Sequence, residues 1–252
     1  MDVQTIPDNY TPAANLLASR TVLVTGAGDG IGRAAALAYA AHGATVILTG
    51  RTVEKLEATY DAIETAGGPQ PAIVPLDLAT AGEEDAAQMA EAIGSTFDHL
   101  DGLLHNAGVL GERRAIASAS WKAWQEVMQV NVNSQFLLTR ALLPLLEASA
   151  QASVIFTSSG VGRQGRAYWG AYAVSKFATE GLVQVLADEL ENTTDIRVNS
   201  LNPGATNTAM RRAAYPGEVP TDNPSPGDIM PAYLYLMGAD SAGISGAAFD
   251  AR

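Results

Sequence analysis

Cysteine is absent from the 252 residues, and lysine is scarce. A chain without cysteine can form no disulfide, thiolate nucleophile or zinc–thiolate site. Only three of the 15 basic residues are lysines, and 27 Asp and Glu residues leave a formal net charge of −12. We therefore expect no nucleic-acid partner, because binding to phosphates needs a basic face.

Long apolar runs are also missing. No run reaches the length of a membrane span, and residues 1–20 have neither a basic start nor the apolar core of a signal peptide. We expect a cytoplasmic protein with no membrane partner. Twenty-four glycines and 12 prolines occur without a period in a chain that is 47% hydrophobic, which predicts a globular protein. This length suits one hydrophobic core, and hence one domain.

Strand-like apolar segments alternate with longer helical patterns from Thr21 onward. This alternation predicts a parallel sheet with helices on both faces. The sequence thus predicts an α/β protein with one domain at residues 21–252, a doubly wound seven-stranded sheet, and an N-terminal extension at residues 1–20. The expected strands are residues 21–25, 44–49, 72–76, 102–104, 153–157, 196–201 and 248–250.

A glycine-rich segment, Thr25-Gly-Ala-Gly-Asp-Gly-Ile-Gly32, joins the first expected strand to the first expected helix. Bare backbone and the amides of a helix N-terminus are what a nucleotide pyrophosphate needs at that place. The segment is typical of a Rossmann fold, with an ordinary glycine turn as the alternative. The expected cofactor contacts here are Gly26, Gly28, Asp29, Gly30, Ile31 and Gly32.

Four further motifs follow in order. They are His105-Asn-Ala-Gly108, Asn131 five residues before Phe136, Ser159 thirteen residues before Tyr172 in Tyr172-Ala-Val-Ser-Lys176, and Asn202-Pro-Gly204. Together with the glycine segment, they make the chain resemble the short-chain dehydrogenase/reductase superfamily from about residue 21 to 250. The resemblance implies an oxidoreductase that transfers a hydride between NAD(P) and a small carbonyl or secondary alcohol substrate. It also implies a homodimer or homotetramer, whereas His105 receives no ligand role.

Tyr172 and Lys176 are four residues apart and therefore share one face of a helix. A tyrosine with a pKa near 10 is a poor acid at neutral pH unless a neighbouring ammonium lowers that pKa. The resemblance implies that Tyr172 is the general acid/base, that Lys176 lowers its pKa and binds the nicotinamide ribose, and that Ser159 bonds the substrate oxygen. It implies that Asn131 anchors a water relay to Lys176. The alternative is a non-catalytic NADP-binding sensor or scaffold protein, which would be free to lose Tyr172 or Lys176.

The end of the second expected strand bears on cofactor choice, because a carboxylate there would bind a ribose 2′-hydroxyl and repel a 2′-phosphate. Gly50 and Arg51 stand there instead, so we expect NADP(H), with NAD(H) as the alternative. Asp29 argues against this, since NADP-dependent relatives often carry a base there. Further cofactor contacts implied by the resemblance are Asp77, Leu78, Asn106, Ala107, Gly108, Tyr172, Lys176, Pro203, Gly204, Thr206 and Thr208.

The identity of the substrate does not follow from the sequence. A variable flap over the pocket is expected at about residues 205–228. Arg163, Tyr168 and Trp169 lie between Ser159 and Tyr172 and are the candidates for contacting substrate. No metal site is expected, because the three histidines do not form a His-Glu-x-x-His pattern.

Overall fold

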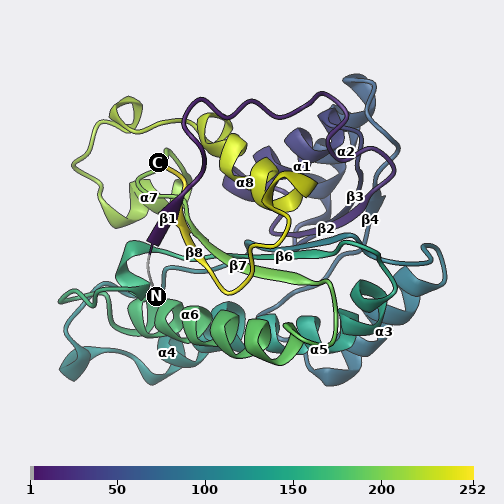
Figure 1. The fold of residues 1–252 in the computed structure, drawn as a ribbon. Coiled ribbons are helices and arrows are strands. Elements are labelled where there is room, and N and C mark those ends of the chain that lie inside the picture. Colours follow the sequence, from purple (N-terminus) through teal and green to yellow (C-terminus); the bar gives the residue numbers. More distant parts are fainter. Residues whose placement is uncertain (1–2) are drawn as a thin grey trace.

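The structure is a computed structural model and describes residues 3–252. One sheet of eight parallel strands crosses the molecule in the order β1-β8-β7-β6-β5-β2-β3-β4 (Figure 1). This confirms the predicted α/β fold class. The strands are β1 (Val3–Thr5), β2 (Thr21–Thr25), β3 (Thr45–Thr49), β4 (Ala72–Ile73), β5 (Gly102–His105), β6 (Ser153–Thr157), β7 (Arg197–Asn202) and β8 (Ala248–Asp250).

Helices cover both faces of this sheet (Figure 1). They are α1 (Gly30–Ala41), α2 (Val53–Thr65), α3 (Glu83–Gly94), α4 (Trp121–Met128), α5 (Ser134–Glu147), α6 (Gly170–Leu190), α7 (Ala209–Ala214) and α8 (Met230–Met237). The helices α1, α2 and α8 pack on one face, and α3, α4, α5 and α6 lie on the other. Within residues 3–252, none of the helices is long and apolar enough to cross a membrane.

The central strands are apolar on both faces because both faces are covered. In β2, Val22 and Val24 belong to the core beside α1 and α8, whereas Leu23 points into the core beside α5 and α6. All three side chains are fully buried. An unbroken run of apolar residues thus identified this strand in the sequence.

The sheet has eight strands where seven were expected, and the additional one is β1. Val3 pairs with Ala248, so part of the expected N-terminal extension belongs to the sheet. A three-residue strand is too short for its periodicity to stand out. The strand expected at residues 72–76 ends at Ile73, although the amides of Val74 and Leu76 still donate to the Leu48 and Gly50 carbonyls.

The chain order reverses between β2 and β5, which are neighbours in the sheet but far apart in sequence. Connections leave these two strands toward opposite sides, so a crevice opens beyond their carboxyl ends. The loops that follow β2, β5, β6 and β7 meet at this edge. They carry most of the residues singled out by the sequence motifs.

Candidate active site

The glycine-rich turn connects β2 to α1 and brings bare backbone to the crevice. Gly26 has φ +69°, a conformation that favours glycine. A Cβ on Gly32 would lie 2.2 Å from the carbonyl oxygen of Gly26, so the turn is too close-packed for a side chain there. Asp29 caps α1, and its carboxylate accepts a hydrogen bond from the Gly30 amide at 2.7 Å.

Thr25 fastens the turn to the loop after β5. Its hydroxyl donates to the Leu104 carbonyl at 3.1 Å and accepts from the amides of Asn106 at 2.9 Å and Ala107 at 3.1 Å. The Asn106 side chain donates back to the Thr25 carbonyl at 3.2 Å. These bonds hold the segment at residues 106–108 against the glycine-rich turn, where it forms one wall of the crevice.

Two adjoining cavities occupy the crevice, and they share Gly26, Asp29, Ala107, Gly108 and Ala209. The central cavity, of about 320 Å³, contains Ser159, Tyr172 and Lys176. Its other expected cofactor contacts are Gly30, Ile31, Asn106, Ala107, Pro203, Gly204, Thr206 and Thr208. The outer cavity, of about 390 Å³, is lined by Gly28, Arg51, Asp77 and Leu78. The structure thus brings nearly all the sequence-predicted residues to one continuous crevice.

The outer cavity has the donors that a nucleotide 2′-phosphate needs. Arg51 follows β3 and is exposed. Lys55 pairs with Asp29 at 2.7 Å, and this contact lowers the pKa of Asp29. The carboxylate that argued against NADP is therefore balanced by a neighbouring ammonium. With the helix N-terminus and the close-packed glycines, these residues fit a dinucleotide that carries an extra phosphate.

Tyr172 and Lys176 project from one face of α6 into the central cavity, beside Ser159, which follows β6. The Lys176 ammonium donates to the Thr157 carbonyl at 2.7 Å and lies 5.7 Å from the centre of the Tyr172 ring. Burial lowers the pKa of Lys176 to about 8, although Glu180 opposes this effect. Burial raises the pKa of Tyr172, and the Ser159 hydroxyl lowers it by hydrogen bonding. The expected net decrease for this tyrosine is therefore not found, since burial has the larger effect.

Asn131 and Gly32 lie behind the cavity walls. Asn131 is in a π-helical turn between α4 and α5 and is completely buried. Its side chain accepts from the Val109 amide at 2.8 Å and donates to the Val109 carbonyl and the Ser175 hydroxyl, each at 3.0 Å. Asn131 thereby ties the loop after β5 to the residue that precedes Lys176.

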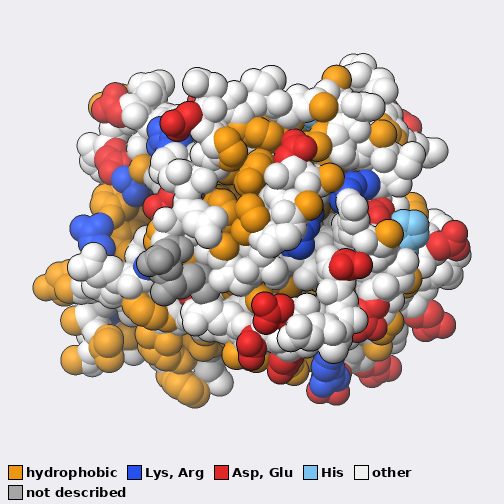
Figure 2. All heavy atoms as spheres, viewed as in Figure 1, with side chains coloured by type: hydrophobic (Ala, Val, Ile, Leu, Met, Phe, Trp, Pro, Cys, Tyr) orange, Lys and Arg blue, Asp and Glu red, His pale blue; other side chains and the backbone are white. Residues whose placement is uncertain are grey.

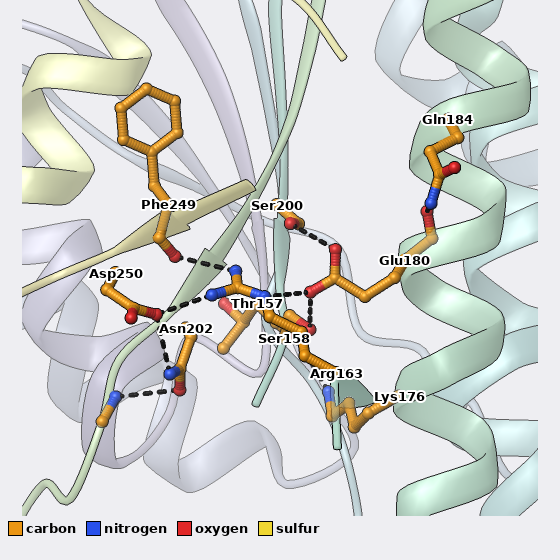
Figure 3. Close-up of polar contacts among 11 residues, drawn as sticks. Thr157, Ser158, Arg163, Lys176, Glu180, Gln184, Ser200, Asn202, Phe249 and Asp250 are labelled. Atoms are coloured by element: carbon orange, nitrogen blue, oxygen red, sulfur yellow. Dashed lines mark hydrogen bonds and ion pairs between the residues drawn. The ribbon is translucent and has the colours of Figure 1, made fainter. Parts of the chain in front are cut away.

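A buried polar network lies around Glu180, next to Ser158 and Arg163 (Figure 3). The carboxylate of Glu180, one turn beyond Lys176 on α6, accepts from the hydroxyls of Ser158 at 2.6 Å and Ser200 at 2.7 Å. It also accepts from Arg163 at 3.0 Å. The network joins α6 to the ends of β6 and β7, and sequence reasoning missed it because its members are far apart along the chain.

Arg163 is not a residue of the pocket, contrary to the prediction from its position between Ser159 and Tyr172. Figure 3 shows its guanidinium between Glu180 and Asp250, and the bond to Asp250 is 2.7 Å long. It also donates to the Phe249 carbonyl at 2.9 Å. Two carboxylates and a carbonyl therefore hold this side chain away from the cavity.

The other two candidate substrate contacts differ from each other. Tyr168 has φ +70°, is 62% exposed and does not line either cavity. Trp169 is buried, lines the central cavity and packs 5.8 Å from Tyr172, measured between ring centres. The cavity also has three apolar lining residues that no sequence motif indicated: Leu110 in the loop after β5, and Met210 and Ala214 in α7.

His105 stacks on Phe156 inside the core, and burial lowers its pKa to about 3.

The chain is similar to known proteins over almost its whole length. The family described as short chain dehydrogenase matches residues 20–218. The uncharacterized oxidoreductase YciK of Escherichia coli K12 is 54% identical over 97% of this chain and 96% of its own. A short-chain dehydrogenase of Shigella flexneri 2a, solved in complex with NADP, has a TM-score of 0.93 at 54% identity, with 95% of this chain and 99% of that chain covered. One from E. coli CFT073, complexed with NADPH, has a TM-score of 0.93 at 55% identity, with 96% of this chain and 100% of that chain covered.

Proposed function

Because this chain belongs to the short-chain dehydrogenase family, we propose that it is an NADP-dependent oxidoreductase acting on a carbonyl compound or the matching secondary alcohol. The observation that carries the proposal is the meeting of Ser159, Tyr172 and Lys176 in the cavity that the glycine-rich turn also lines. A proton donor and a dinucleotide cradle share one space. Carbonyl reduction requires that arrangement, since a proton and a hydride must arrive at adjacent atoms.

NADP(H) is the cofactor that this site suits. The turn at residues 26–32 and the N-terminus of α1 would hold the pyrophosphate, and Arg51 would bind the 2′-phosphate. Asn106, Gly108 and Thr206 would line the nicotinamide half. A bound nicotinamide supplies the hydride in reduction and accepts it in oxidation. The solved relatives with NADP and NADPH support this choice.

Tyr172 donates the proton in the direction of reduction. As the carbonyl carbon gains a hydride, its oxygen gains negative charge and takes the phenolic proton. Ser159 donates a hydrogen bond to the same oxygen and so holds it near the phenol. Lys176 has a pKa of about 8, is mostly charged at pH 7, and stabilises the phenolate that proton transfer leaves. In oxidation the phenolate takes the proton back from the alcohol.

Replacement of Tyr172 by phenylalanine tests the mechanism. Tyr172→Phe keeps the buried ring but removes the donor, so turnover should fall by roughly 10²- to 10⁴-fold while NADPH affinity stays near wild type. Tyr168→Phe is the matched control, because Tyr168 is four residues earlier and outside the cavities, and should retain full turnover. The measurements are NADPH absorbance with a panel of aldehydes and ketones, and NADPH fluorescence for binding.

Three outcomes separate the alternatives. Wild-type turnover in Tyr172→Phe would contradict the assignment of Tyr172. A wild-type protein that binds NADPH but reduces no member of the panel would favour the sensor or scaffold function. An Arg51→Ala variant that still prefers NADPH over NADH would contradict the role given to Arg51.

A further inference from the structure

Arginine side chains gather around Tyr215, directly after α7, where the flap borders the central cavity. The Arg113 guanidinium lies 4.5 Å from the centre of the Trp169 ring and 4.9 Å from that of Tyr215. Arg211 lies 3.9 Å from the same Tyr215 ring, and Arg166 donates to the Tyr215 hydroxyl at 3.2 Å. Since Trp169 and Arg211 both line the cavity, this arginine cluster, residues 113, 166 and 211, borders its mouth.

The charge of the cluster is only partly balanced. Arg211 pairs with Glu218 through two hydrogen bonds. Among residues 3–252, no carboxylate lies within 4.0 Å of the guanidinium nitrogens of Arg113 or Arg166. The chain as a whole has a net charge of −12. Arg113 and Arg166 are both exposed, and they lie beside residues that line the central cavity.

The way Arg113 is held leaves it free to bind an anion. The guanidinium carbon of Arg113 lies over the Trp169 and Tyr215 rings, whose planes are 47° apart, so cation–π contacts hold the group there. The N–H donors lie in the plane of the group and form a fork that matches a carboxylate or a phosphate. Among the residues that the structure describes, none accepts a hydrogen bond from Arg113. The two rings thus hold the guanidinium in place without accepting a conventional hydrogen bond from its N–H groups.

The cavity between Tyr172 and the cluster is apolar. Leu110, Trp169, Met210 and Ala214 line it. The separations of 5.8 Å from Tyr172 to Trp169 and 4.5 Å from Trp169 to Arg113 place that guanidinium at most about 10 Å from the Tyr172 ring. A molecule spanning this space would meet a proton donor, then an apolar wall, then a cationic fork.

We propose that the substrate is an acid as well as a carbonyl compound: its carbonyl lies at Tyr172, its carbon skeleton on the apolar wall, and its carboxylate or phosphate on Arg113 and Arg166. The carbonyl end of this assignment rests on the proposed function. The anionic end rests on the arginine cluster alone. Arg113 and Arg166 are then the residues that determine substrate specificity, and Arg211, already paired with Glu218, contributes less.

Matched pairs of aldehydes test the proposal. The acids are 4-formylbenzoate and the longer 4-formylcinnamate, each measured beside its neutral methyl ester, and 4-formylphenyl phosphate distinguishes phosphate from carboxylate. Wild-type enzyme should show a kcat/KM at least roughly tenfold higher for an acid than for its ester, as a bond to a charged group implies. Arg113→Gln and Arg166→Gln should each remove most of that preference through KM, and leave the esters unchanged.

Arg114→Gln is the control, because Arg114 is the next residue along the chain and pairs with Glu112. It should keep the preference for the acids. Calorimetric titration of 4-(hydroxymethyl)benzoate into the NADPH-bound protein, where an alcohol cannot react, gives a second readout without turnover, and Arg113→Gln should weaken that binding roughly tenfold.

Equal rates for acids and esters in the wild type would overturn the anionic assignment and leave the proposed function standing. No turnover of any aldehyde, with tight binding of 4-(hydroxymethyl)benzoate that depends on Arg113, would overturn the proposed function and support the anion site. An acid preference that persists in both glutamine variants would also overturn the assignment to these two arginines.

Discussion

Burial and charge oppose each other at Lys176. The side chain is 3% exposed, and its ammonium is held by the Thr157 carbonyl. Burial lowers its pKa from 10.5 to about 8, because removing water disfavours the charged form. The proposed chemistry requires a charged Lys176, but burial makes that charge unfavourable for the stability of the folded protein.

This conflict predicts how stability depends on pH. Between pH 8 and 10.5 the unfolded chain binds more protons at Lys176 than the folded chain does, so this group raises the free energy of unfolding as pH rises. From pH 7 to pH 9, the wild type should gain about 1 kcal/mol relative to Lys176→Met. Urea unfolding of both proteins at the two pH values measures this difference. Lys122→Met, on the exposed side of α4, should follow the wild type. A constant difference between wild type and Lys176→Met would refute the prediction.

At the scale of single residues, the sequence correctly placed those side chains whose position follows from their spacing along one helix or from the end of one strand. Tyr172 and Lys176 are one helical turn apart, and the glycines follow a strand, so local rules place them. Arg163 shows where such rules fail. Its partners Glu180 and Asp250 are 17 and 87 residues away, and nothing local distinguishes an arginine in a network from one in a pocket.

Helix α6 carries the proposed acid/base residue and is fixed to three strands by the Glu180 network. The Glu180 side chain is 9% exposed and that of Arg163 is 19% exposed, so this ion pair is mostly desolvated. The pair between Asp29 and Lys55, at the other end of the crevice, is 65% and 55% exposed. Both pairs have short contacts and both join secondary-structure elements, but only the first is mostly shielded from water.

Breaking the two pairs should therefore have unequal effects. Arg163→Met leaves the buried Glu180 carboxylate without its cationic partner and should lower the free energy of unfolding by about 3 kcal/mol. Lys55→Met should cost less than about 1 kcal/mol, because water screens an exposed pair. Adding Glu180→Met to Arg163→Met should recover part of the loss, since no lone charge is left buried. Chemical denaturation measures all four proteins, and similar losses for the two single variants would contradict the argument.

Most helices and strands could be predicted from the periodicity of apolar residues and from the glycines that mark the turns between them. The expected helix at residues 171–190 is α6 to within one residue, and the strand expected at 153–157 is β6. The failures were β1 and the far end of β4. A three-residue edge strand depends on a distant partner. The apolar pattern of β4 continues past Ile73, and so do the backbone bonds from Val74 and Leu76, which left no local sign of where the strand ends.

At the scale of the whole molecule, α5 and α6 present apolar side chains to solvent. Phe136 of α5 and Phe177 of α6 are 48% and 47% exposed, and Val185 of α6 is 57% exposed. Figure 2 shows hydrophobic side chains gathered below the sheet, in the region that the labels α4 and α6 mark in Figure 1. We infer that a second copy of the chain covers this surface, because apolar patches of this kind mark subunit contacts.

The expected assembly is a homodimer or homotetramer at micromolar concentration. Phe177→Asp would place a charge on this apolar surface and should weaken association by at least about tenfold. Val53→Asp is the control, because Val53 is 40% exposed but lies on α2. Light scattering over a dilution series measures both variants. A wild type that is monomeric throughout would disprove the assembly.

The pairing of β1 with β8 also sets an order for biosynthesis. In the described sheet β1 has one neighbour, and that neighbour, β8, is the last of the described strands in chain order. Residues 3–5 must therefore wait until residues 248–250 have been synthesised before their backbone finds its partner. The same late strand delivers Asp250 to Arg163. The pairing of β1 and the bond between Asp250 and Arg163 therefore both form only when β8 joins the sheet. A nascent chain stalled before β8 would contain the glycine-rich turn but would lack both of these contacts.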